Sequence, residues 1–254
     1  PVLLGQSLPE FGYRRRVTLH CSPDGAWGFY RQGSGDIVPI EKCLLAHDVI
    51  NDALTKLLAR PQPQAPGVLC GALTLEVHEQ GGFGATVILR ENVAESIGTT
   101  RLHFGDLPKE MREWIDALGQ VRVTLRGQEL YRSPGPEGDE ATRYPFGHFS
   151  QVNEAGNLIL QSEVLTQVPA TEVTELYAGA GNFALPLARR GTFVEAIEVD
   201  AQLVEYGIAC ARAEGLTSRV QFITMSCEQF LRARSPRGSV LLDPPRSGVK
   251  ELLP

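Results

Sequence analysis

The chain has 254 residues, of which 43% are hydrophobic, and its formal net charge at pH 7 is −6. This length leaves room for two domains of ordinary size, and the composition is that of a globular protein. No apolar run is long enough to cross a bilayer, so we expect neither a membrane partner nor a secretory signal. Because the net charge is negative, a nucleic-acid partner would require a local basic patch.

The cysteines indicate the cellular compartment, and the first residue indicates how the chain begins. Five cysteines are an odd number, and none of them has CxxC spacing. This argues against a disulfide framework and against a self-contained zinc site, and it favours a reducing, cytoplasmic location. Residue 1 is Pro rather than Met, from which we expect the chain to begin inside a longer gene product. We expect a monomer.

Residues 1–148 have the pattern of a smaller mixed α+β domain that offers a possible RNA contact. Alternating apolar residues predict strands, and a Gly-Gly pair between the first two of them predicts a hairpin turn. The expected strands are 73–77, 85–89 and 121–125, with the turn at 80–82. The basic run from Arg14 to Arg16 has two interpretations, an RNA contact or a solvated strand edge, and its charge alone favours the strand edge.

Two helices are predicted in the same half. Leucines at helical spacing indicate one over residues 43–59, and a shorter one opens with Pro108 and runs to residue 118. A proline-rich stretch at 60–67 is typical of an extended polyproline conformation, and residues 133–139 are predicted to form a mobile loop.

From Phe149 onward strands alternate with helices, which predicts a doubly wound parallel sheet of the α/β class over residues 149–254. The predicted helices cover 151–166, the stretch up to Leu187, and 201–214, the last ended by Gly215. The predicted strands are 173–177, 193–199, 220–224 and 240–243.

A glycine-rich loop follows the first of these strands and opens a helix. Gly179 permits a tight turn, and Gly181 lets a ligand approach the backbone closely. Glu198 ends the second strand, where a carboxylate can accept hydrogen bonds from both hydroxyls of a ribose. The pattern fits both NAD and other nucleosides. The alternative to ligand binding is that the glycines serve only the packing of the turn. Tyr177 and Asn182 flank the loop, either as ligand contacts or as a packed strand end and a helix cap.

The motif after the fourth strand discriminates between the ligand classes. In a doubly wound sheet the first and fourth strands are neighbours, so Asp243 is expected across from the glycine loop. Pro244 and Pro245 stiffen the exit of the strand. NAD dehydrogenases have no reason to carry this motif, whereas methyltransferases acting on nucleobases place an acid or amide before two prolines. Arg246 stands where enzymes that methylate amino groups have an aromatic residue, which indicates a different chemistry.

Together these motifs resemble the RumA/TrmA-type RNA uracil-5-methyltransferases, over most of the chain. The segments that carry the resemblance are 149–153 with Asn157, 175–183 and 242–248. It implies a Rossmann-like methyltransferase domain that transfers a methyl group from S-adenosylmethionine to C5 of a uridine in RNA, with 23S ribosomal RNA favoured over transfer RNA. It also implies that one set of residues surrounds the cofactor: Gln151, Tyr177, Gly179, Gly181, Asn182, Glu198 and Asp243. The position that often holds the adenine matches poorly, with Ser226 or Cys227 there.

The resemblance also implies parts that the chain does not contain. Cys43 matches the last ligand of a [4Fe-4S] cluster whose other three ligands would precede Pro1, with a buried core thiol as the alternative. An N-terminal RNA-binding barrel is missing. The nucleophilic cysteine and the base would follow Pro254, so no catalytic residue is expected in this chain, and we expect the fragment to be inactive. An open apolar edge at the fourth strand agrees with a longer sheet.

Two other functions remain open at this point. An NAD-dependent oxidoreductase would account for the glycine loop and Glu198, but not for the motif at Asp243 or the segment around Gln151. A non-catalytic relative that only binds RNA would keep the fold without the chemistry.

Overall fold

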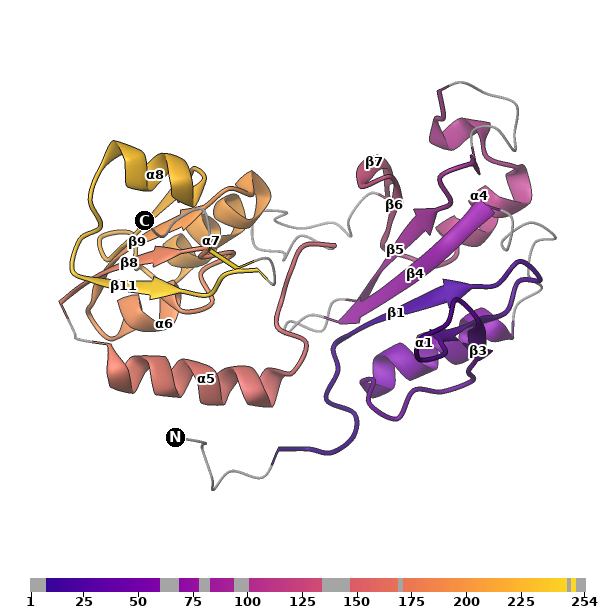
Figure 1. Cartoon of the computed structure of the whole chain (residues 1–254), viewed down its shortest axis with the longest axis horizontal. Coiled ribbons are helices and arrows are strands. Elements are labelled where there is room, and N and C mark those ends of the chain that lie inside the picture. Colours follow the sequence, from indigo (N-terminus) through magenta and orange to yellow (C-terminus); the bar gives the residue numbers. More distant parts are fainter. Residues whose placement is uncertain are drawn as a thin grey trace. The chain divides into compact units, whose positions relative to one another are not determined.

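The structure, a computed structural model, describes residues 8–59, 69–77, 83–93, 101–133, 147–168, 171–245 and 248–249. The chain forms two compact units, each with a β-sheet of its own (Figure 1). The first unit takes in the chain up to Pro136 together with Ser150–Ala155, and the second takes in Glu137–Phe149 and the chain from Gly156 onward. The segment Ser150–Ala155 therefore packs with the first unit, although its flanking residues belong to the second.

The first unit is built on a seven-stranded sheet in the order β3-β2-β1-β4-β5-β6-β7. Neighbouring strands are antiparallel except β5 and β6, which are parallel and are joined by a crossover that contains helix α4. The strands are β1 (Arg16–Cys21), β2 (Trp27–Tyr30), β3 (Ile37–Pro39), β4 (Cys70–Val77), β5 (Phe83–Leu89), β6 (Val121–Leu125) and β7 (Gln128–Arg132). The helices are α1 (Asp48–Leu58), α4 (Lys109–Asp116) and the short 3-10 helix η1 (Phe104–Asp106).

The core of the first unit lies on one face of this sheet. Side chains alternate along a strand, so the buried odd-numbered residues of β1, β4, β5 and β6 share that face, where α1 and α4 pack on them. The indole rings of Trp27 and Trp114 stack in this core with their centroids 6.0 Å apart. The opposite face is polar, and on it the hydroxyls of Thr18 and Thr74 share a hydrogen bond of 2.8 Å.

The strands expected at 73–77, 85–89 and 121–125 are confirmed as parts of β4, β5 and β6. The antiparallel pairing of β4 with β5 confirms the hairpin, although its turn at 80–82 lies outside the described residues, as do the stretch 60–67 and residues 134–139 of the predicted loop. Strands β1, β2, β3 and β7 were not predicted.

The helix predicted over 43–59 begins later, at Asp48. The amide of Asn51 explains why, because its Oδ1 accepts from the Cys43 main-chain N–H at 2.9 Å and its Nδ2 donates to the carbonyls of Cys43 and Ala46. These bonds hold residues 43–46 in a loop, and Leu44 is 64% exposed there. The shorter predicted helix is confirmed as α4, with Pro108 as its N-cap residue.

The basic run is engaged within the first unit. The guanidinium of Arg15 forms an ion pair with Glu154. Arg16 lies opposite Glu76 in the register of β1 and β4, and its NH2 approaches the nearly fully buried Glu76 carboxylate to 2.5 Å. The strand is an interior one, between β2 and β4, so the interpretation as a strand edge was wrong. Two of the three arginines thus neutralise carboxylates of their own unit, and an RNA contact of this run stays a prediction.

The second unit contains a parallel sheet in the order β10-β9-β8-β11. Its strands are β8 (Glu172–Leu176), β9 (Phe193–Glu198), β10 (Val220–Thr224) and β11 (Ser239–Leu242). Its helices are α5 (Glu154–Gln167), α6 (Ala184–Arg189), α7 (Ala201–Ala213) and α8 (Cys227–Ala233). The predicted parallel fold is confirmed, and so is the pairing of the first and fourth strands, with Leu241 opposite Glu175.

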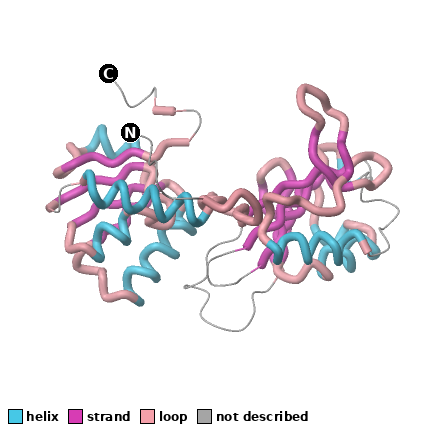
Figure 2. The backbone as a smooth tube through the Cα atoms, turned by 90° about the horizontal axis from the view of Figure 1, so that it is seen from below, coloured by secondary structure: helices cyan, strands magenta, loops and turns pink. Residues whose placement is uncertain are grey.

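Helices cover both faces of this sheet. Apolar residues of α5, α6 and α7 pack around Val173 and Val194, whereas α8 packs on Leu176 and Ile197, which point the other way. Figure 1 shows α6 and α8 on opposite sides of the strands, and Figure 2 shows the helices of this unit beside its strands.

The four strands of the second unit end within one residue of their predicted bounds. Gly215 has φ 71° just after α7, which confirms it as the stop of that helix. Helix α8 was not predicted. At the edge of the described sheet, β11 leaves Val240 and Leu242 exposed, the open apolar edge that the sequence indicated. None of the helices in the described part of the chain has both the length and the hydropathy of a transmembrane segment.

Candidate functional site

The turn after β8 contains backbone conformations that most residues avoid. Tyr177 has φ 63°, Gly179 has φ 56° and Gly181 has φ 91°. Glycine adopts positive φ without steric cost, but tyrosine is strained there. Such strain persists where the surroundings enforce it, often at functional sites. Here it turns the chain sharply out of β8, and the Tyr177 ring packs beside the core under α8.

The two loop glycines are required for different reasons. A Cβ at Gly179 would meet nothing within 4 Å, whereas one at Gly181 would lie 2.7 Å from Cζ of Phe222. The same ring lies 2.5 Å from an ideal Cβ at Gly207 of α7. Gly181 is thus required by the packing of the Phe222 ring of β10, and the close approach of a ligand to its backbone stays a prediction. The open backbone of the loop is at Gly179.

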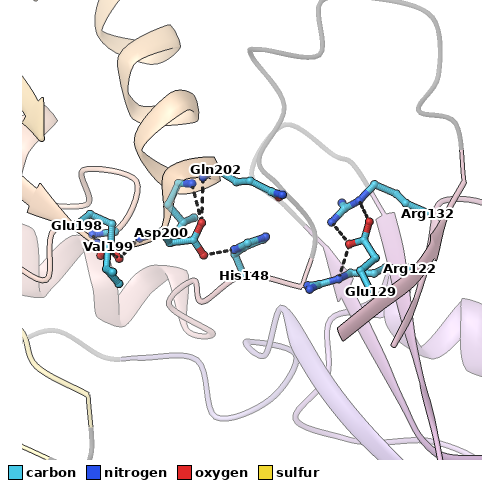
Figure 3. Close-up of polar contacts among 10 residues, drawn as sticks. Arg122, Glu129, Arg132, His148, Glu198, Val199, Asp200 and Gln202 are labelled. Carbon is cyan, nitrogen blue, oxygen red and sulfur yellow. Dashed lines mark hydrogen bonds and ion pairs between the residues drawn. The ribbon is translucent and has the colours of Figure 1, made fainter. Parts of the chain in front are cut away.

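Glu198 ties the end of β9 to the glycine loop. Its Oε2 accepts from the Gly179 N–H at 2.9 Å, and its Oε1 accepts from the N–H groups of Val199 at 2.8 Å and Asp200 at 2.9 Å (Figure 3). A carboxylate has about four lone-pair positions, so these bonds leave about one for another donor. Beside it the apolar side chain of Val199 is 67% exposed.

Glu175 is a buried acid that the sequence analysis missed. The pKa of its carboxyl group is raised to about 8, mainly by burial. The charges of Asp243 and Glu198 add to this rise, and hydrogen bonds from the N–H groups of Ala184 and Phe183 oppose it. Its Oε2 has no hydrogen-bond partner among the described residues. The available signal was its place inside a strand of a parallel sheet, where both faces are buried and an unpaired acid is costly.

Asp243 follows β11 at the same end of the sheet, since parallel neighbours end at a common edge. Its side chain is exposed, and its charge acts on Glu175. Pro244 and Pro245 follow, and the N–H of Gly248 donates to the Pro245 carbonyl at 2.8 Å. Arg246 and Ser247 lie outside the described residues.

Three carboxyl groups therefore gather where β8, β9 and β11 end. Their mutual influence is visible in the raised pKa of Glu175, to which Asp243 and Glu198 both contribute. Like charges at short range disfavour one another's ionisation, and a cation among them relieves that repulsion. This end of the sheet is therefore suited to a ligand that carries positive charge. The pyrophosphate of NAD would add negative charge there.

Asn182 is held by helix α5. Its side chain exchanges two hydrogen bonds with the Asn157 amide, at 2.8 and 2.9 Å, and Gln161 donates to its main-chain and side-chain oxygens at 2.9 and 3.0 Å. The N-cap residue of α6 is Phe183 rather than Asn182, so the helix-cap alternative was wrong. The amide of Asn182 instead fixes the glycine loop against α5.

Two further predicted residues lie in the first unit. Gln151 belongs to the segment Ser150–Ala155 and is half-buried, so the structure does not bring it together with the glycine loop as part of one unit. Cys43 is partly buried against the core, and its backbone is held by Asn51. In the described part of the chain no cluster of His, Cys, Asp or Glu could hold a metal ion. The cofactor role of Gln151 and the cluster role of Cys43 stay predictions.

The residues after β10 have structural roles. Ser226 and Gln229 form a capping box at the start of α8, in which the Ser226 hydroxyl accepts from the Gln229 N–H at 3.2 Å. Cys227 packs with Phe230 in the core, and burial raises the pKa of its thiol. A buried thiol of raised pKa is a poor nucleophile. Cys210 packs beside the other core of this unit.

Comparison with known proteins supports one family. Residues 142–239 match the family model described as tRNA (Uracil-5-)-methyltransferase. The chain is 36% identical, over 96% of its length, to the 23S rRNA (uracil(1939)-C(5))-methyltransferase RlmD of Acidithiobacillus ferrooxidans, and 32% identical, over 94%, to that of Salmonella typhi. It covers 58% and 57% of these two relatives and thus spans a little over half of their length.

A solved structure with the same fold also matches. It is the Pyrococcus abyssi tRNA (uracil-54, C5)-methyltransferase in complex with S-adenosyl-L-homocysteine, with a TM-score of 0.65 and 18% identity. The match covers 95% of this chain and 62% of that one, so it extends over both units. The fold, the family model and the relatives agree with the motifs around Gly179 and Asp243. The chain belongs to the family of RumA/TrmA-type uracil-C5 methyltransferases.

Proposed function

We propose that the protein takes part in the transfer of a methyl group from S-adenosylmethionine to C5 of a uridine in RNA, and that the RNA is 23S ribosomal RNA. The convergence of Glu175, Glu198 and Asp243 at one end of the parallel sheet carries the assignment of the cofactor. S-adenosylmethionine has a sulfonium and an ammonium group, and its charge complements the three acids. The names of the relatives support uridine in 23S ribosomal RNA as the substrate.

The residues around the loop would hold the cofactor in distinct ways. Glu198 would accept from a ribose hydroxyl while it keeps the Gly179 turn in place. The exposed Val199 offers an apolar surface to the adenine, and the open backbone at Gly179 permits close approach. Glu175 and Asp243 would face the positively charged end of the cofactor. The first unit would supply an RNA contact.

The bound cofactor would supply an electrophilic methyl group. A thiolate must first add to C6 so that C5 can attack this methyl group. A base then removes the C5 proton, and the thiolate leaves C6 as the double bond forms again. Burial raises the pKa of Cys21 to about 11 and raises the pKa values of Cys70 and Cys227 as well. These three thiols are unsuited to the first step, and Cys43 and Cys210 pack against the apolar cores. We therefore assign the nucleophile to no residue of this chain. We place the protein in the cytoplasm, where its five free cysteines stay reduced, as a monomer.

Two measurements test the proposal. Isothermal titration of the chain with S-adenosylhomocysteine and with NADH should give binding of the first and none of the second, and the reverse result would assign the site to NAD. Tritium release from C5-labelled uridine in 23S ribosomal RNA should follow addition of S-adenosylmethionine to the product of the complete gene. Tritium release from transfer RNA alone would identify transfer RNA as the substrate in place of 23S ribosomal RNA. Binding of RNA without tritium release from either RNA would indicate a non-catalytic relative.

A further inference from the structure

A histidine of the segment before Ser150 contacts the turn that contains Glu198. Nδ1 of His148 lies 2.5 Å from Oδ2 of Asp200 (Figure 3). The imidazole is 12% exposed and the carboxylate 32% exposed, so the pair is partly shielded from water. Because a carboxylate only accepts hydrogen bonds, His148 donates its Nδ1–H. Both residues belong to the second unit.

Asp200 connects this histidine to the Glu198 carboxylate. Its other oxygen, Oδ1, caps α7 by accepting from the N–H groups of Gln202 at 3.0 Å and Leu203 at 3.3 Å. Its main-chain N–H donates to Oε1 of Glu198 at 2.9 Å. The orientation of one residue therefore depends on the helix cap, on His148 and on Glu198 at once. A charge-assisted hydrogen bond that fixes the Asp200 side chain also restricts the backbone N–H that Glu198 uses.

We propose that His148 is a positioning residue for the nucleoside site: through Asp200 it holds the turn at 198–200 so that Glu198 presents its remaining lone pair to a ribose hydroxyl. This inference rests on the proposed function, since it needs a nucleoside cofactor beside Glu198. His148 itself touches no reacting atom. It acts by limiting the rotation of Asp200, and preorganised acceptors bind a ligand with a smaller loss of conformational freedom.

The alternative is that the contact only stabilises the fold, and a ligand with one hydroxyl less distinguishes the two. The probes are S-adenosylhomocysteine and its 2′-deoxy and 3′-deoxy analogues, titrated into the 254-residue chain by calorimetry. His148→Leu removes the donor. His148→Asn keeps an N–H at the position of Nδ1, because in both side chains that nitrogen is bonded to Cγ. Arg189→Ala is the matched control, because it breaks a bidentate pair with Glu214 at the far ends of α6 and α7.

In the parent chain we expect removal of one of the ribose hydroxyls to weaken binding about tenfold, the effect of one good hydrogen bond. In His148→Leu the affinity for S-adenosylhomocysteine should fall about tenfold. For the deoxy analogue that binds the parent chain more weakly, the same substitution should cause little further loss of affinity, because the hydroxyl that Glu198 recognises is already absent. His148→Asn should restore both values to within about threefold of the parent, and Arg189→Ala should change neither.

Each other outcome counts against a defined statement. Equal losses for S-adenosylhomocysteine and its deoxy analogues in His148→Leu would mean a purely structural contact and would overturn this inference alone. Unchanged affinities in His148→Leu would overturn it too. A parent chain that binds S-adenosylhomocysteine but is indifferent to both hydroxyls would also reject it, while the proposed function would stand. A parent chain that binds no S-adenosylhomocysteine would reject the proposed function, and this inference with it.

Discussion

The carboxylate of Glu198 accepts a hydrogen bond of 2.9 Å from the main-chain N–H of Gly179, nineteen residues earlier in the chain. The side chain at the end of β9 is thus part of the turn that follows β8. Together with the N–H groups of Val199 and Asp200, Gly179 occupies three of about four lone-pair positions on this carboxylate. Acceptance from both hydroxyls of a ribose would therefore require one of these bonds to open or be shared.

Replacement of Glu198 should affect both the loop and the ligand. In Glu198→Ala three N–H groups lose their acceptor, so the unfolding free energy should fall by about 1 to 3 kcal/mol. Affinity for S-adenosylhomocysteine should fall at least about tenfold. Glu198→Gln keeps one oxygen acceptor and should lie between the parent and the alanine variant. Calorimetric titration and urea unfolding measure the two effects, with Glu214→Ala, which removes an exposed ion pair, as the control. A stable Glu198→Ala variant that binds S-adenosylhomocysteine with the parent's affinity would show that the glycine loop keeps its conformation without Glu198.

Asp243 is exposed, so its replacement should change ligand binding far more than stability. Asp243→Asn removes a negative charge near Glu175, and the affinity should fall more for the sulfonium cofactor than for the neutral sulfur of S-adenosylhomocysteine. We expect a decrease of about threefold to tenfold in the preference for the charged ligand. Competition titration of the two ligands measures this ratio. Asp52→Asn on the exposed side of α1 is the matched control, and an equal decrease there would point to the overall charge of the chain.

Glu175 should make the second unit less stable as the pH rises. Its pKa is raised from the ordinary 4.5 to about 8, mainly by burial, so the unfolded chain releases this proton first. The stabilising contribution of the protonated group is complete below about pH 4.5 and is lost progressively as the pH rises toward about 8. Glu175→Gln mimics the protonated form, so the variant should gain stability over the parent as the pH rises through this range.

Hydrogen exchange of the β8 and β9 amides measures this difference within the second unit. Tryptophan fluorescence would not serve, since both tryptophans of the chain, Trp27 and Trp114, lie in the core of the first unit. A stability difference between parent and Glu175→Gln that is independent of pH would mean that Glu175 keeps its ordinary pKa. The same variant should bind S-adenosylmethionine more weakly above about pH 8, where the parent carboxyl is ionised.

The elements of the second unit, except α8, could be predicted because their signals are local. Alternating apolar residues and the glycines at 179 and 215 lie inside or beside the elements that they define. The site was predicted in part for the same reason, since the neighbouring positions of β8 and β11 follow from the topology of a doubly wound sheet. Glu175 was missed because its burial depends on α6 and β11, which lie elsewhere in the sequence.

The first unit was harder to predict because its contacts are distant in sequence. Arg16 is a charged residue on an interior strand, and the buried Glu76, sixty residues later, makes that placement favourable. The sequence around Arg16 contains no signal that indicates this partner. Likewise, the leucines before Asp48 have helical spacing, but the Asn51 side chain takes over the backbone groups of Cys43 and Ala46 that a helix would have used.

The glycine loop offers a test that separates backbone strain from packing. Gly179→Ala introduces only an unfavourable positive φ, which should cost about 1 to 2 kcal/mol. Gly181→Ala has the same kind of strain and also brings its Cβ to 2.7 Å from Phe222, so overpacking should add about 1 to 3 kcal/mol. Phe222→Leu replaces the ring that causes the clash with a smaller side chain. The double variant Gly181→Ala/Phe222→Leu should therefore lose less unfolding free energy than the sum of the losses in the two single variants. Urea unfolding of the four variants gives this coupling. Simple additivity, or equal costs at the two glycines, would mean that the Phe222 ring moves aside freely.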